Sequence, residues 1–162
     1  MKGWKRNSTR LETSDRIVVQ ILAFIVSVIP LTVYMKLVQL DGIMKFAWTG
    51  KDTHADFFSY WKSQLIIICL GFLFILLIYS IIKRGAFSVK KIYIPLMIYT
   101  LMVFLSAIFA EHREVAFGGF VERYEGAWVL LGYVVFTLSA ALVIKDEKSA
   151  KPIMIALFIS CT

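Results

Sequence analysis

Long apolar runs constrain this chain more than any other feature of its sequence. Residues 65–82, 92–110 and 127–144 contain no charged side chain, and residues 17–40 contain one, Lys36. About 20 apolar residues of helix cross a hydrocarbon core of roughly 30 Å, and a charge at its centre costs about 2.5–3.5 kcal/mol. The runs are continuous rather than alternating, which favours helices over a barrel. We therefore predict an all-α, polytopic transmembrane helical bundle.

The overall composition supports an integral membrane protein. The chain has 162 residues, of which 59% are hydrophobic, and its mean hydropathy is +0.76. Soluble domains are about 45–50% apolar. The net charge of +7 does not indicate nucleic-acid binding, because the basic residues are dispersed between the apolar spans.

The expected organisation is a basic tail over residues 1–16 followed by a transmembrane region over residues 17–162. Pro30 should kink the first span, 17–40. The last run, 152–162, has 11 residues and ends with the chain. We expect it to be the start of a fifth span, so that the chain is an N-terminal fragment with four complete spans; a short interfacial tail is the alternative.

Lysine and arginine counts predict the orientation. Twelve lie in the tail, in residues 83–91 and in residues 145–151, which are alternate segments on one side of the bundle. Five lie in residues 41–64 and 111–126 on the other side. The positive-inside rule then places the N-terminus in the cytoplasm and the second pair of segments outside. We expect a multi-pass protein of the bacterial plasma membrane, in contact with membrane lipids.

The outward segment 111–126 ends in a dense charge cluster, GGFVERYEG. Its two adjacent glycines permit a tight turn. Arg123 should emerge at the external headgroups, where it can bind a phosphate bidentately. Glu122 and Glu125 can position or neutralise it, and Tyr124 suits the same depth. Charges at a helix end are also ordinary solvated flanks, and that alternative stays open.

Other polar groups carry weaker indications of chemistry. Asp52, His54 and Asp56 would share one face of an extended segment, and Glu111, His112 and Glu114 form a second group. We interpret both as solvated loops rather than metal sites. Cys69 and Cys161 lie in apolar runs as small hydrophobes. The sequence contains no Ser/His/Asp arrangement, Walker loop or nucleotide fingerprint.

At GGFVERYEGAWVLLGYVVF the chain resembles the O-antigen ligase and O-antigen polymerase superfamily of bacterial membrane enzymes. The short local match covers about residues 118–145, and the rest of the resemblance is architectural. The residues that carry it are Gly119, Glu122, Arg123, Tyr124, Glu125 and Gly126.

The resemblance implies a membrane glycosyltransferase of polysaccharide biosynthesis in the cell envelope. Such an enzyme moves a glycan from an undecaprenyl-diphosphate carrier to an acceptor on the outer face of the plasma membrane, without a cofactor. Arg123, Glu122, Tyr124 and Glu125 would then contact the lipid diphosphate, and the catalytic residues would lie beyond this chain, leaving the fragment inactive alone. The alternatives are a fragment of a transporter or flippase, and a non-enzymatic membrane protein.

Overall fold

The computed structural model describes residues 13–47, 52–84, 93–144 and 147–161. Of these residues 76% are helical, which confirms the predicted helical class. The elements in chain order are α1 (Thr13–Ser27), the 3-10 turn η1 (Ile29–Leu31), β1 (Lys36–Gln39), α2 (Ile43–Ala47), β2 (Thr53–Asp56), α3 (Ser59–Arg84), α4 (Tyr93–Ile108), α5 (Arg113–Gly118), α6 (Ala127–Val143) and α7 (Glu147–Cys161).

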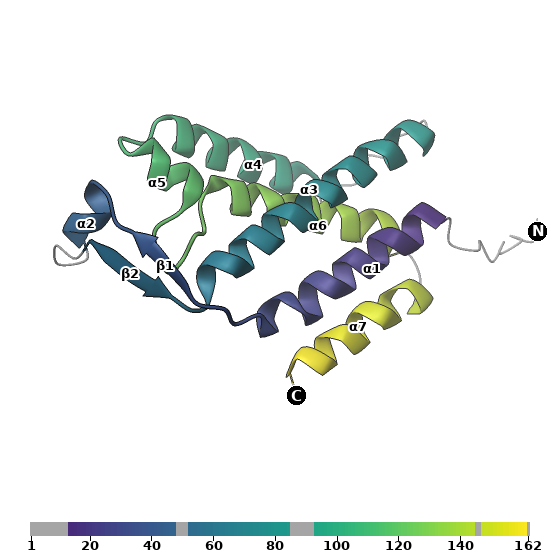
Figure 1. Ribbon diagram of the computed structural model, residues 1–162. Coiled ribbons are helices and arrows are strands. Elements are labelled where there is room, and N and C mark those ends of the chain that lie inside the picture. The colour runs from purple at the N-terminus through teal and green to yellow at the C-terminus, as the bar shows by residue number, and fades with distance from the viewer. Residues whose placement is uncertain (1–12, 48–51, 85–92, 145–146, 162) are drawn as a thin grey trace, which may run out of the picture.

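The five longer helices run back and forth along one direction (Figure 1). The strands, α2 and α5 gather at one end, which we call the loop end; α1 and α7 begin at the opposite end, where α3 and α6 finish. Helix α1 packs on α7, and α6 packs on both α3 and α4. Successive long helices therefore run in alternate directions.

The core lies where α1, α3 and α6 meet. Its buried members are Val18, Val19 and Leu22 of α1, Leu70 and Leu73 of α3, and Val143 of α6. The α1 residues recur at a spacing of three and four, which places them on one helical face. Helix α6 also approaches α3 closely at Gly132, where an added Cβ would contact the Leu70 side chain. A small residue here lets the two helices approach, as small residues do in membrane bundles.

Two helices are long and apolar enough to cross a membrane, by length and composition alone. They are Ser14–Leu31, which takes in η1, and Ser59–Lys83. Helices α4 and α6 are apolar but have only 16 and 17 residues. We expected four full-length spans, and within the described residues two helices reach that length.

The first predicted span, 17–40, is wrong in its second half. The backbone N–H of Val28 makes the last α-helical bond, to Phe24 O at 2.9 Å, and η1 then adds two 3-10 bonds, from Leu31 N–H to Val28 O and from Thr32 N–H to Ile29 O. Pro30 follows and has no N–H to continue the helix. The chain then becomes extended, and Lys36–Gln39 form β1, antiparallel to β2 with Lys36 opposite Asp56. This hairpin is also the exception to an all-α fold.

Two further boundaries differ from prediction. Residues 13–16, expected in the basic tail, already belong to α1, and residues 1–12 lie outside the described part. Residues 147–151, expected as a turn, form the start of α7, which runs through Pro152. Pro152 is the sixth residue of α7, so it lies inside the helix and removes one backbone hydrogen bond, the one to the carbonyl of Lys148.

Candidate functional site

The two loop segments expected on one side of the bundle meet at the loop end. His54 on β2 and Glu122 in the turn before α6 are 68 residues apart in sequence, and their Nε2 and Oε1 atoms lie 2.8 Å apart. This contact confirms that segments 41–64 and 111–126 share one end. It also ties the charge cluster to the hairpin rather than leaving it as an isolated flank.

Two glycines close the turn over residues 119–126. Gly119 has φ +85°, and a Cβ there would run into the backbone of Tyr124. A Cβ at Gly126 would run into the backbone of Phe117 and Gly119. The two ends of the turn therefore touch through their backbones, which only glycine permits. The tight turn predicted at the glycine pair is present, and it depends on the second glycine of the pair.

The backbone between these glycines is unusual. Glu122 and Tyr124 have φ values of 75° and 44°, in the left-handed region that L-residues rarely adopt. The N–H groups of Arg123 and Tyr124 both donate to Phe120 O, at 3.0 and 2.8 Å. Unfavourable backbone conformations of this kind tend to occur at ligand sites. Here they turn Arg123 and Glu125 out to solvent while the intervening side chain points inward.

That inward side chain, Tyr124, anchors the turn on the start of α3. Its ring meets the Tyr60 ring edge-on, with centroids 5.5 Å apart. Burial, with smaller contributions from the negative charge of Asp56 and from Tyr60, raises the pKa of Tyr124 to about 12. The phenol therefore stays protonated and neutral at any physiological pH.

Asp56 joins the hairpin, α3 and the turn. Its Oδ1 atom accepts hydrogen bonds from the backbone N–H groups of Phe58 and Ser59 at 2.9 and 2.8 Å, and so caps α3. The residue is 3% exposed. Asp56 Oδ2 and the Tyr124 hydroxyl are both buried without a hydrogen-bond partner among the described residues. Two polar atoms beneath the turn thus remain to be satisfied by water or by a small side-chain rearrangement.

A cluster of aromatic side chains extends from Tyr124 toward the end of α1. Trp61 meets Tyr60 at 5.5 Å and Tyr34 at 5.8 Å, again edge-on. The Lys36 Nζ atom lies 3.8 Å from the centroid of the Tyr60 ring and 5.6 Å from that of Trp61. Amphipathic rings and snorkelling lysines are typical of the membrane–water boundary.

The four predicted site residues differ in their exposure and in their contacts. Arg123 and Glu125 are exposed, and Arg123 forms no ion pair within 4 Å with a described residue. Glu122 is also exposed, but it contacts His54 rather than holding the arginine. Tyr124 is half-buried. The guanidinium of Arg123 is therefore exposed and has no ion-pair partner among the described residues, on a turn held by the Glu122–His54 and Tyr124–Tyr60 contacts.

The first set of residues considered for metal binding makes three separate contacts. Asp52 pairs with Lys45, which raises the pKa of that ammonium through a hydrogen bond and the carboxylate charge. His54 contacts Glu122, and Asp56 caps α3. The other set, Glu111, His112 and Glu114, is exposed. Across ranges 13–47, 52–84, 93–144 and 147–161, no three His, Cys, Asp or Glu side chains are placed to hold a metal ion.

Sequence reasoning missed the parts that brace the turn. Asp56 precedes the start of α3 with two apolar residues between, and an acidic residue there is a recognisable helix-cap signal. Lys36 and Tyr60 gave no such signal, because their contact depends on a strand that the apolar run concealed.

The chain matches none of the protein families, curated proteins or solved structures with which it was compared.

Proposed function

We propose that this chain is the N-terminal part of an O-antigen ligase-like membrane glycosyltransferase of the bacterial plasma membrane. The parent enzyme would move a glycan from an undecaprenyl-diphosphate carrier to an acceptor on the outer face. The observation that carries the proposal is the exposed Arg123, held at a braced turn directly above a bundle with an apolar exterior.

The membrane location is supported by the outward faces of the helices. Met97 on α4 is 72% exposed and Phe158 on α7 is 74% exposed, and large apolar side chains surround both. Of the 16 residues of α4, the buried ones are Tyr93 and Ala107. Water-soluble monomers rarely expose contiguous apolar patches beyond a few hundred Å². Lipid is the solvent that suits such a surface.

Four crossings and the start of a fifth are part of the proposal. At about 1.5 Å per residue, α3 is about 39 Å long, whereas α4 and α6 are about 24 and 26 Å long. Short apolar helices cross a bilayer by thinning it locally, at a modest cost. The alternating helix directions agree with successive crossings. The basic segments 83–91 and 145–151, together with the tail, then favour a cytoplasmic N-terminus.

The chemistry proposed for the turn is recognition of a lipid-linked diphosphate. A guanidinium offers two parallel N–H donors to phosphate oxygens and stays charged. It can also stabilise charge that develops on a diphosphate leaving group. Glu125 would set the local charge, Glu122 would tether the turn through His54, and Tyr124 would anchor it. No described residue is assigned as catalytic base.

The test compares Arg123→Ala and Arg123→Lys in the full-length parent, with glycan transfer and carrier binding as readouts. Loss of a charge-assisted hydrogen bond costs about 1.5–3 kcal/mol, so transfer should fall roughly 10- to 150-fold in Arg123→Ala. Arg123→Lys should recover part of the binding. Arg113→Ala removes another exposed arginine from the same segment and should leave transfer unchanged. Parental transfer in both Arg123 variants would end the proposal.

A further inference from the structure

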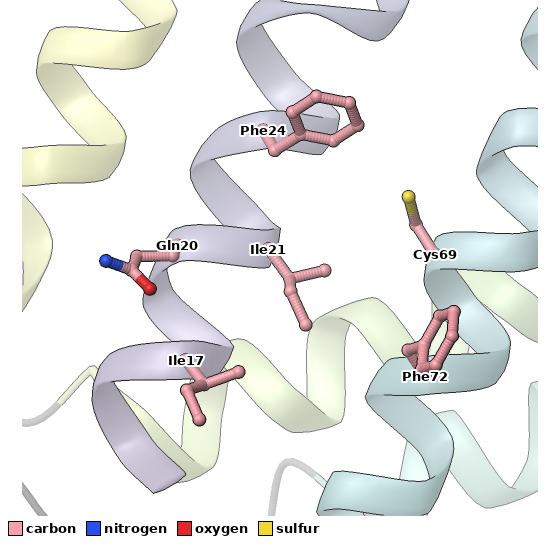
Figure 2. Close-up of a pocket in the computed structure, with 6 residues that line it drawn as sticks. All are labelled: Ile17, Gln20, Ile21, Phe24, Cys69 and Phe72. Carbon is pink, nitrogen blue, oxygen red and sulfur yellow. The ribbon is translucent and has the colours of Figure 1, made fainter. Parts of the chain in front are cut away.

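An open hollow of about 320 Å³ lies between α1 and α3 (Figure 2). Its lining residues are Ile17, Gln20, Ile21, Phe24, Cys69 and Phe72. In Figure 2 Ile21 and Phe24 extend from α1 toward the side of α3 that carries Cys69 and Phe72, whereas the Gln20 amide points away. The lining residues all come from α1 and α3, which also pack on each other and on α6.

The hollow continues as an apolar stripe along α3. Trp61, Leu65, Ile68 and Phe72 follow one another at spacings of four, three and four residues, which places them on one face of the helix. Phe72 is 61% exposed. From Trp61 to Phe72 the helix rises about 16 Å. That length is close to half of a roughly 30 Å hydrocarbon core, which is the depth of one lipid leaflet.

The ammonium group of Lys36 lies at the loop end of this stripe. Lys36 Nζ lies over the Tyr60 ring and near the Trp61 ring, as described above. Lys36 makes no salt bridge with a described carboxylate. Its charge lies at the level where the headgroups of that leaflet would begin. The stripe thus combines an apolar path of one-leaflet length with a positive charge at its outer end.

We propose that the α1–α3 hollow binds one anionic phospholipid, with an acyl chain along the stripe and the phosphate on Lys36. The inference rests on the membrane placement in the proposed function, but not on glycan transfer. It concerns a bilayer phospholipid held by α1 and α3, whereas the proposed carrier contact lies at Arg123. Charge complementarity selects an anionic headgroup, because a zwitterionic lipid brings its own cation to the phosphate.

The experiment measures the lipid that stays on the chain after release from nanodiscs containing equal amounts of phosphatidylglycerol and phosphatidylcholine. Intact mass spectrometry should show one retained phosphatidylglycerol in preference to phosphatidylcholine. Ile21→Trp fills the hollow and should reduce retention about fivefold or more. Lys36→Gln should keep a lipid but lose the preference for phosphatidylglycerol. Leu101→Trp on the exposed face of α4 and Lys62→Gln at the start of α3 are matched controls that should behave like the parent.

Several results would overturn the inference. Equal retention of the two lipids by the parent chain would refute the role of Lys36, and unchanged retention in a folded Ile21→Trp variant would refute the hollow. If Ile21→Trp fails to fold by circular dichroism, the lipid preference of the parent and of Lys36→Gln still decides. Carbonate extraction separates the two proposals: a chain released from membranes contradicts both, and an integrated chain without lipid preference contradicts this one alone.

Discussion

Replacing Gly119 with alanine should open the turn that presents Arg123. Gly119 has φ +85° and ψ +167°, a conformation that is essentially restricted to glycine. Forcing another residue into it costs about 1–3 kcal/mol. In addition, the new Cβ would collide with the Cα and carbonyl carbon of Tyr124. These are backbone atoms, so the turn itself must move to relieve the contact.

The neighbouring glycine provides a matched control. Gly118 is the last residue of α5, and a Cβ there would meet nothing within 4 Å. Alanine is favoured over glycine in a helix by about 0.5–1 kcal/mol, so Gly118→Ala should be neutral or slightly stabilising. Gly119→Ala should therefore lower the free energy of opening the turn by about 1–3 kcal/mol, which is roughly 5- to 150-fold in the opening equilibrium, whereas Gly118→Ala should not lower it.

Amide hydrogen exchange measures this opening directly. The N–H groups of Arg123 and Tyr124 are protected by their bonds to Phe120 O, and local opening sets their exchange rates. Relative to the parent chain, exchange at these two amides should be roughly 5- to 150-fold faster in Gly119→Ala and no faster in Gly118→Ala. Equal exchange in the two variants, or faster exchange in Gly118→Ala, would refute the argument that Gly119 closes the turn.

Two further predictions concern the residues beneath the turn. The tyrosinate absorbance step that Tyr124→Phe removes should lie near pH 12, above the value of about 10 for an exposed tyrosine. Because the unfolded phenol ionises first, the contribution of Tyr124 to the stability of the turn should be complete below about pH 10 and should fall as the pH rises toward about 12. If the absorbance step lost in Tyr124→Phe lies near pH 10, the burial of Tyr124 is contradicted. Asp56→Ala should lower the unfolding free energy by about 0.5–2 kcal/mol because it removes the cap of α3, whereas Asp56→Asn should keep most of the stability of the cap. Denaturant melts measure both variants, and equal losses in the two would show that capping is not the cause.

The sequence predicted the helices best where apolar runs had no competing local signal. Residues 92–110 and 127–144 nearly match α4 and α6, and residues 65–82 lie within α3, which begins six residues earlier. The first run failed because Pro30 does more than bend the helix: without its N–H the helix ends, and an apolar segment beyond it is free to pair as β1. Hydropathy records only that side chains avoid water, and it does not separate a helix from a short strand of equal apolarity.

The candidate site was predictable in outline and not in its contacts. The glycine pair indicated a turn, and the distribution of basic residues placed two loop segments at one end. The pairing of His54 with Glu122 spans 68 residues, and no local pattern encodes it. The inward orientation of Tyr124 depends on φ values that non-glycine residues adopt only under tertiary constraint. Arg123 could therefore be singled out as a charge, but not as the exposed member of a braced turn.

Cysteine labelling in intact cells tests the central claim most directly, which is that the loop end faces outward with Arg123 at the external headgroups. Cys69 and Cys161 are first replaced by alanine, and a single cysteine is placed at Arg123 or, as a control, at the exposed Lys148 near the opposite end. A membrane-impermeant maleimide should label the Arg123→Cys variant in intact cells and the Lys148→Cys variant only after permeabilisation. Labelling of Arg123→Cys only after permeabilisation would contradict the account.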